Sequence, residues 1–340
     1  MTRTAKRRFS RELSGIVDGL AIGAHGPVLV HHYEPPADDM WMDDVIPGKL
    51  SALERATGEV LWSSPCEVGY GRGFGAGFAS DGAALVLGPT AKGHMAVRMA
   101  LANGALLAAH EIEAFDDALV HEDMAITVTP KSVVAYDSRT LIEQWEYSRP
   151  GERYHHVARA GGRVFVSVTH SSRKHGVLCL DAENGEFQTE ILSPRGATIH
   201  GIAASGDGLI VLTRDLQSAL PREVVGQFMI QLSRLEDSRR GDTLSLLALP
   251  IDSTAGDAPL WWEILSTQPV DEIPEVAISA DSGKLYLVSG ALIEVRDILT
   301  GRKLGEWAIP GLDERVAWQV ASGAGLLAEE SRVSLYELPA

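Results

Sequence analysis

Short stretches in which hydrophobic and polar residues alternate recur along the whole chain, separated by turns of small or polar residues. Alternation with a period of two is the pattern of a β-strand with one buried face. Runs such as 163–168 (RVFVSV) and 284–288 (KLYLV) each follow one of these turns. Seven such turns occur, at 24–26, 80–82, 121–123, 160–162, 205–208, 280–283 and 322–325. The pattern therefore predicts seven β-hairpins.

A second kind of turn alternates with the first. Its clearest copy is residues 53–62 (LERATGEVLW), and degenerate copies follow at 99–104, 136–141, 180–185 and 296–301. Most copies contain glycine after a short polar residue, and Asn-Gly is a strong hairpin signal because both residues tolerate a positive φ. Leu141 occupies the glycine position of its copy, so we expect that turn to differ from the others.

One hairpin of each kind per repeat gives a unit of four strands. Seven such units predict an all-β, seven-bladed β-propeller that forms a single domain over residues 1–340. Residues 316–338 supply only three strands of the last unit. The basic stretch from Lys6 to Leu13 precedes the first hairpin, and we expect it to complete the last blade and so close the propeller.

The 53–62 copy resembles the repeat of the pyrroloquinoline-quinone-type (PQQ-like) propellers, A-x-D-x-x-T-G-x-x-x-W, and the resemblance extends over most of the chain as degenerate copies. The enzymes of that superfamily are similar to one another in having eight blades, export signals, calcium ligands and often adjacent cysteines. This chain departs from them, with seven predicted blades and no adjacent cysteines. The resemblance therefore implies the non-enzymatic branch, whose members serve as assembly and interaction platforms, and we expect no cofactor.

Charge and composition narrow the functional classes. The chain has 30 Lys and Arg against 46 Asp and Glu, a formal net charge of −16, which disfavours nucleic acid or anionic lipid as the main partner. No run of about 18 apolar residues could span a bilayer, and no apolar segment follows the basic N-terminal stretch as a secretory signal requires. The two cysteines, Cys66 and Cys179, lie far apart, which favours the reducing cytoplasm.

Motifs that would indicate catalysis are few. The sequence contains no HExxH, GxSxG or P-loop motif. The glycine-rich run 69–78 (GYGRGFGAGF) is interpreted as small residues where an inner strand approaches the crowded propeller axis. The histidine pairs 31–32 and 155–156 can each present only one imidazole to a given surface, because adjacent residues of a strand point to opposite faces.

A polar pocket at the propeller axis is the alternative hypothesis for function. His156 and His200 fall near the starts of the inner strands of consecutive blades, where Glu275 and Arg315 could join them. Such a pocket would make the protein an enzyme or a small-molecule binder, without a bound metal. The simpler interpretation is that these are ordinary hydrogen-bonded histidines.

Two insertions interrupt the repeat at the same junction, between the second and third strands of a blade. The first, residues 34–49 in blade 1, places Met40, Trp41 and Met42 among aspartates that include Asp43. An apolar anchor surrounded by charge suits contact with a protein, since tryptophan buries a large area and methionine adapts to its partner. The alternative is a loop that buries the tryptophan against its own blade.

The second insertion, residues 216–241 in blade 5, has apolar residues at three- and four-residue spacing, among them Phe228, Met229 and Leu232. This spacing predicts an amphipathic helix whose apolar stripe covers either the propeller itself or another chain. Loops at one junction emerge on one side of a propeller, so we expect both insertions on the same face. The sequence thus predicts a cytoplasmic, non-catalytic scaffold or regulatory subunit that binds a protein partner through that face, and neither nucleic acid nor membrane.

Overall fold

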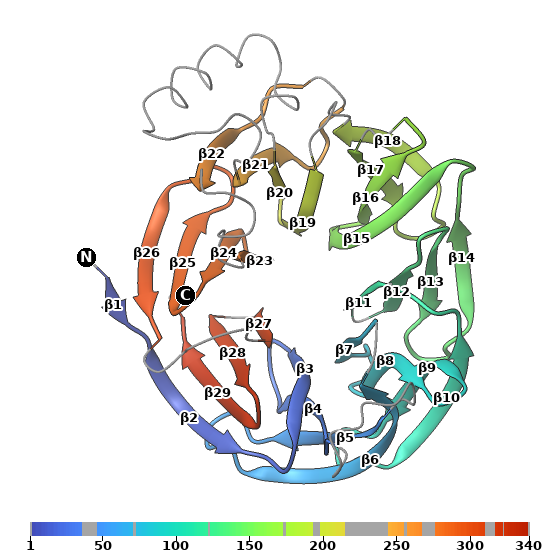
Figure 1. Ribbon diagram of the computed structural model, residues 1–340, viewed down its shortest axis with the longest axis vertical. Helices are drawn as coiled ribbons and strands as arrows, with labels where there is room; N and C mark the ends of the chain where they lie inside the picture. The colour runs from blue at the N-terminus through green and yellow to red at the C-terminus, as the bar shows by residue number, and fades with distance from the viewer. Residues whose placement is uncertain are drawn as a thin grey trace. The chain divides into compact units, whose positions relative to one another are not determined.

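The computed structural model describes residues 2–35, 46–70, 73–121, 123–172, 175–192, 198–214, 244–254, 257–266, 276–309, 317–321 and 323–338. Every regular element in these ranges is a β-strand. The strands form seven sheets, the blades of a β-propeller, as the repeat predicts (Figure 1). In blades 1 to 6, four strands consecutive in the chain lie side by side.

Blades 1, 2, 3 and 7 belong to one compact unit of the chain. Blade 1 consists of β3 (Ile16–Ile22), β4 (Val28–Tyr33), β5 (Ile46–Leu53) and β6 (Val60–Tyr70). Blade 2 consists of β7 (Gly75–Phe78), β8 (Ala84–Thr90), β9 (Gly93–Met99) and β10 (Leu106–Ile112). Blade 3 consists of β11 (Asp117–His121), β12 (Met124–Val128), β13 (Val133–Asp137) and β14 (Glu143–Tyr147). Blade 7 consists of β27 (Ala317–Ala321), β28 (Ala324–Glu329), β29 (Arg332–Glu337) and β2 (Lys6–Glu12).

Blades 4, 5 and 6 belong to a second compact unit. Blade 4 consists of β15 (Glu152–Ala160), β16 (Arg163–His170), β17 (His175–Asp181) and β18 (Phe187–Leu192). Blade 5 consists of β19 (Thr198–Ser205), β20 (Gly208–Arg214), β21 (Leu244–Pro250) and β22 (Trp261–Ser266). Blade 6 consists of β23 (Val276–Asp281), β24 (Lys284–Ser289), β25 (Leu292–Asp297) and β26 (Lys303–Ala308), with the short β1 (Arg3–Thr4) next to β26.

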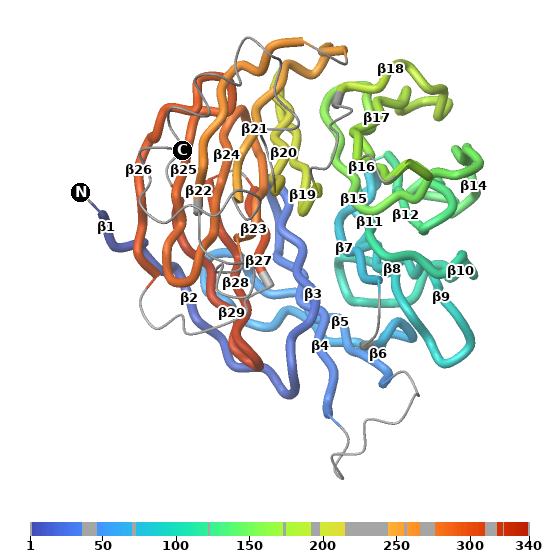
Figure 2. Tube along the Cα trace, turned by 45° about the horizontal axis from the view of Figure 1, so that its top comes forward, coloured from blue at the N-terminus to red at the C-terminus, as the bar shows by residue number. Residues whose placement is uncertain are grey.

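The N-terminal strand completes the seventh blade, as predicted. β2 pairs antiparallel with β29, and the two strands lie side by side in both views (Figure 1, Figure 2). Lys6 and Arg8 form exposed ion pairs with Glu337 on β29, which contribute little to stability. The buried Phe9 joins the apolar cluster between blades 7 and 1, so burial of this ring adds to the backbone pairing of β2 with β29.

The two insertions leave the frame where the sequence predicts, between β4 and β5 and between β20 and β21. Residues 36–45 and 215–243, which contain most of both segments, lie outside the described residues. The helix predicted over 216–241 is therefore not supported, since the described part of the chain contains no helix. It follows that no helix among the described residues is long and apolar enough to cross a membrane.

The central strands of the blades are buried on both faces. All residues of β4 and β12 are buried, as are all but the last of β8. A strand covered on both faces by neighbouring layers selects continuous apolar runs instead of strict alternation. These strands therefore form the core, and the outer strands supply the exposed rim.

The turns between the third and fourth strands dock on the outer strand of the preceding blade. In blade 2 this turn contains Gly104, whose φ is +70° and at which an added Cβ would lie only 2.5 Å from the ring of Trp62 on β6. The Trp62 indole Nε1–H donates to the carbonyl of Leu101 in the same turn, at 2.6 Å. The glycine is thus required both by the backbone conformation and by the aromatic ring that covers it.

Two other blades repeat this contact. In blade 6, Gly301 (φ +67°) lies under Trp261 of β22, with 2.6 Å between an added Cβ and the ring. The Trp261 indole Nε1–H donates to the carbonyl of Ile298 at 2.9 Å. In blade 1, Gly58 (φ +74°) lies under Phe9 of β2. Aromatic ring and glycine turn therefore form a recurring connection between neighbouring blades.

Blade 3 makes the same contact with the residue sizes exchanged. Leu141 has a φ of +61°, so its turn adopts the left-handed conformation of the glycine turns, and the prediction that it would differ is wrong. Its side chain is buried in a cluster with Ala108 of β10. Ala108 follows Gly104, the turn glycine of its own blade, by four residues, and Trp62 follows Gly58 by the same number. Ala108 therefore occupies the position on β10 that Trp62 occupies on β6. A small residue on the strand thus accommodates a large residue in the turn.

This exchange predicts strong coupling between Ala108 and Leu141. We expect Leu141→Gly to destabilise the protein by about 2–3 kcal/mol, because the lost leucine leaves a cavity and relief of the positive φ offsets only about 1 kcal/mol. Ala108→Trp alone should cost about 1–3 kcal/mol through overpacking against the leucine. The double variant recreates the ring and glycine of the other blades, so it should be more stable than the sum of the single effects by at least about 1 kcal/mol.

Urea denaturation of the wild type, both single variants and the double variant measures this coupling. Additive destabilisation in the double variant would show that the two side chains do not share one packing site.

Candidate functional site

Most of the predicted site residues lie outside the described part of the chain. These are the proposed partner-binding residues Met40, Trp41, Met42, Asp43, Phe228, Met229 and Leu232, and Glu275 and Arg315 of the predicted axial pocket. The structure describes the other two pocket residues, His156 on β15 and His200 on β19. These are the first strands of blades 4 and 5.

His156 and His200 lie on neighbouring strands of consecutive blades. β15 packs beside β19, and His200 is near three basic groups. Desolvation of its ring, together with the positive charges of Arg214, His156 and His175, lowers the pKa of His200. The structure therefore places these histidines within one electrostatic neighbourhood.

A β-bulge in β15 adds His155 to this group. The pairing of β15 with β16 shifts register between Tyr154 and Val157, and a bulge breaks the alternation of side chains along a strand. The rings of His155 and His156 lie with their centroids 6.5 Å apart. The expectation that these adjacent imidazoles point to opposite faces is therefore wrong for this pair.

Thr169 on β16 connects two histidines. Its Oγ1 lies 2.9 Å from Nε2 of His155 and 3.1 Å from Nδ1 of His175. A hydroxyl can donate one hydrogen bond while accepting another, so it can serve both rings. Burial, together with the charge of the nearby His170, lowers the pKa of His175. We call His155, His156, His175 and His200 the histidine cluster.

His170 extends the polar network away from the histidine cluster. Its Nε2 lies 3.0 Å from Glu190 and its Nδ1 3.5 Å from Glu152. The Tyr154 hydroxyl donates to the other oxygen of Glu152 at 2.8 Å, and burial raises the pKa of Tyr154, which keeps it a donor at neutral pH. Each polar group of this network thus has a partner within blade 4.

The sequence did not reveal the roles of Thr169 and His175. They are direct partners across the β16–β17 hairpin, so a histidine and a threonine placed symmetrically about the turn are the signal that could have identified them. The bulge between Tyr154 and Val157 has no comparable signature in the sequence.

The other histidine pair belongs to the buried frame. His31 Nδ1 lies 2.5 Å from the carboxylate of Asp18, and its Nε2 lies 2.9 Å from the carbonyl of Val68. His32 donates from Nδ1 to the carbonyl of Ser14 at 2.9 Å. These rings contact different partners on the two faces of β4, so regular alternation holds here.

The histidine cluster contains groups that can change charge near neutral pH. Within the described ranges, no three His, Cys, Asp or Glu side chains are arranged to hold a metal ion. Lowered pKa values keep His175 and His200 neutral at neutral pH and allow them to gain protons in acid. The histidine cluster therefore contains two groups whose charge can change when the pH falls below neutral.

We expect the stability of the protein to fall as the pH decreases from about 7 toward 5. The folded-state pKa of His175 and of His200 is below the unfolded value, so the unfolded chain binds more protons in this interval and is favoured there. Replacing both by Asn should flatten this part of the profile.

Urea midpoints measured across this pH range for the wild type and the His175→Asn/His200→Asn variant check the prediction. His110→Asn, which changes an exposed histidine on β10, is the matched control. Parallel profiles for the wild type and the double variant would contradict the assignment.

Comparison by sequence identifies a propeller family. Residues 47–215 match the repeat family described as outer membrane protein assembly factor BamB. No protein with a curated description matches the chain in sequence.

Solved structures share the architecture over almost the full length. The WD40 domain of Neurospora crassa Pan2 has a TM-score of 0.61 and 11% identity, covering 100% of this chain and 97% of that one. The computationally designed Ika8 protein has a TM-score of 0.50 and 12% identity, covering 98% and 100%. BamB from Moraxella catarrhalis has a TM-score of 0.49 and 12% identity, covering 97% and 98%. For Pan2 and Ika8, identities this low show a common fold alone.

Proposed function

Because this chain is a PQQ-like β-propeller repeat protein, we propose that it is a non-catalytic scaffold or regulatory subunit that binds another protein. The binding residues are those of the two inserted segments, 34–49 in blade 1 and 216–241 in blade 5. The observation that carries the proposal is that both segments leave a regular blade at the same junction, after its second strand.

Neither segment is needed to pair the strands that flank it. β4 and β5 are in register from Val28 opposite Leu53 to Tyr33 opposite Gly48. β20 and β21 are in register from Gly208 opposite Pro250 to Arg214 opposite Leu244. A hairpin of about 2–5 residues would connect such strands. The additional residues are therefore not needed to connect the strands, and long loops on a rigid frame commonly serve in binding.

The residue types in these segments suit a protein surface. Trp41 can fill an apolar pocket of a partner, and Met40 and Met42 adapt to its shape. The surrounding aspartates, Asp43 among them, favour a partner whose pocket has basic groups at its rim. Phe228, Met229 and Leu232 in the second segment add further apolar area.

Two observations support a binding role over catalysis. The matched family is described as an assembly factor, and the polar side chains described on blade 4 hydrogen-bond mainly to one another. The proposed partner is a protein, with no role for nucleic acid, membrane or a cofactor, in agreement with the net charge of −16.

We also place the scaffold in the cytoplasm as part of this proposal. Cys66 and Cys179 are buried, free thiols. Burial raises the pKa of Cys66 to about 11, which keeps it protonated and unreactive. Reduced thiols of this kind are typical of a reducing compartment.

Replacing Met40, Trp41 and Met42 by Ser should weaken partner binding by about tenfold or more, as expected when a central aromatic anchor is lost. The partner is first identified by affinity purification from the native host with mass spectrometry, and the affinities of the wild type and the variant are then compared.

The matched control is Leu106→Ser/Leu107→Ser, which removes two exposed leucines from β10 and should leave the affinity unchanged. Equal affinity of the triple serine variant and the wild type would exclude this segment as the contact. A large drop in its melting temperature would show that the segment belongs to the core.

A further inference from the structure

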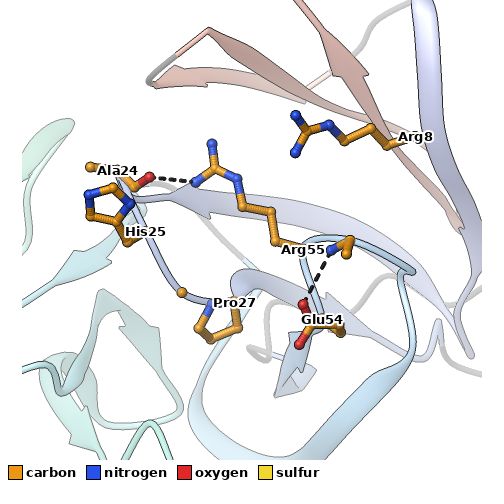
Figure 3. Close-up of a pocket in the computed structure, with 8 residues that line it drawn as sticks. Arg8, Ala24, His25, Pro27, Glu54 and Arg55 are labelled. Atoms are coloured by element: carbon orange, nitrogen blue, oxygen red, sulfur yellow. Dashed lines mark hydrogen bonds between the residues drawn. The ribbon is translucent and has the colours of Figure 1, made fainter.

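A second polar site lies at the end of blade 1 opposite the insertion of residues 34–49. The β3–β4 and β5–β6 turns share this end, because alternate connections of an antiparallel sheet lie on the same side. Together with Arg8 of β2 they line a pocket of about 480 Å³ (Figure 3). This volume is in the range of small-molecule sites.

Arg55, in the β5–β6 turn, is held in place by backbone groups. Its Nη1 donates to the carbonyls of Gly23 at 2.6 Å and Ala24 at 3.1 Å, and its Nη2 donates to that of Ala321 at 3.5 Å. These acceptors are neutral, so they orient the guanidinium without neutralising it. Among the described residues no carboxylate forms an ion pair with Arg55, and its Nε–H has no hydrogen-bond partner there.

Arg8 reaches the same space from blade 7. The neighbouring Phe9 packs over Gly58 in the β5–β6 turn, which fixes this part of β2 beside the pocket. Arg8 donates from Nε to Glu337 at 3.1 Å, and Glu337 also pairs with Lys6. The terminal nitrogens of Arg8 are directed toward Arg55 (Figure 3), and no described residue accepts a hydrogen bond from them.

The two guanidinium groups are close enough to interact. Burial, reinforced by the positive charge of Arg8, lowers the pKa of Arg55. Arg8 is already paired with Glu337 through its Nε, so what the site offers an anion is the second positive charge of Arg55 together with the remaining N–H donors of both guanidinium groups. The exposed His25 adds a further donor to the lining. Glu54 also lines the pocket and accepts from the backbone N–H of Ala56 at 3.3 Å, so the lining contains one carboxylate beside the two guanidinium groups.

We propose that this pocket binds the carboxylate or phosphate group of a small molecule, held between Arg8 and Arg55. A guanidinium presents its N–H groups as a planar fork that matches two oxygens of such an anion. The protein's net charge of −16 does little to oppose binding, because interactions beyond about 8 Å are largely screened at physiological ionic strength. This site is independent of the proposed partner contact.

Isothermal titration calorimetry of the full chain with inorganic phosphate and, separately, with citrate tests the proposal, with sodium chloride at matched ionic strength as the blank. We expect saturable binding of at least one of the two anions, and their relative affinities distinguish a phosphate ligand from a carboxylate ligand. Arg55→Gln should weaken binding by about tenfold or more.

Because Arg55 also connects three backbone carbonyls, Arg8→Gln is the decisive variant. It keeps the Lys6–Glu337 pair, should leave the thermal melt unchanged and should still weaken anion binding by about tenfold. Arg7→Gln removes the same charge from the adjacent position of β2, outside the pocket lining, and should bind as the wild type does. Saturation by neither anion at millimolar concentration, or equal binding by the wild type and Arg8→Gln, would overturn the proposal.

Discussion

Where the third strand of a blade turns into the fourth, the backbone comes so close to the preceding blade that a Cβ would collide with an aromatic ring. At Gly104 and Gly301 this distance would be 2.5 and 2.6 Å, and the covering tryptophans also donate a hydrogen bond to a carbonyl of the same turn. A left-handed turn, an apolar cover and one directed hydrogen bond are thus satisfied together. The contact fixes the spacing and the register of neighbouring blades within each unit, and the remaining loops are built on it.

The repeat can be predicted from the sequence because this constraint leaves a trace in residue types. Turns of small and polar residues, most of them with a glycine, recur along the chain and mark the blades, and the last unit's lack of a fourth strand points to the strand that the N-terminus supplies. The same reasoning failed at Leu141 because it considered the turn alone. The positive φ is retained there, and the room for the side chain comes from Ala108 on a different strand. When each position is compared only with the residue usual at that position, the comparison does not detect that a smaller side chain at one position makes room for a larger one at another.

The candidate sites were predictable to a smaller extent, for a physical reason that differs between them. His156 and His200 follow from strand order, because the first strands of consecutive blades pack together. The approach of the His155 and His156 rings does not, because the bulge between Tyr154 and Val157 breaks the alternation of side chains and has no residue signature here. Arg8 and Arg55 were both visible in the sequence, one as a basic edge strand and the other inside the clearest repeat copy. The sequence did not show that Phe9 packs on Gly58. This contact positions β2 so that Arg8 lies near Arg55.

Blade 1 therefore carries two different surfaces at its two ends, and the antiparallel order of its strands keeps them separate. The insertion lies at the β4–β5 connection, whereas the arginines meet at the β3–β4 and β5–β6 turns. A small anion at one end and a protein at the other would not compete for the same atoms. Any influence of one on the other has to pass through β4 and β5, whose residues are largely buried and paired along their full length. Close-packed strands of this kind resist gradual deformation, so the two sites are expected to act independently unless the blade shifts as a whole.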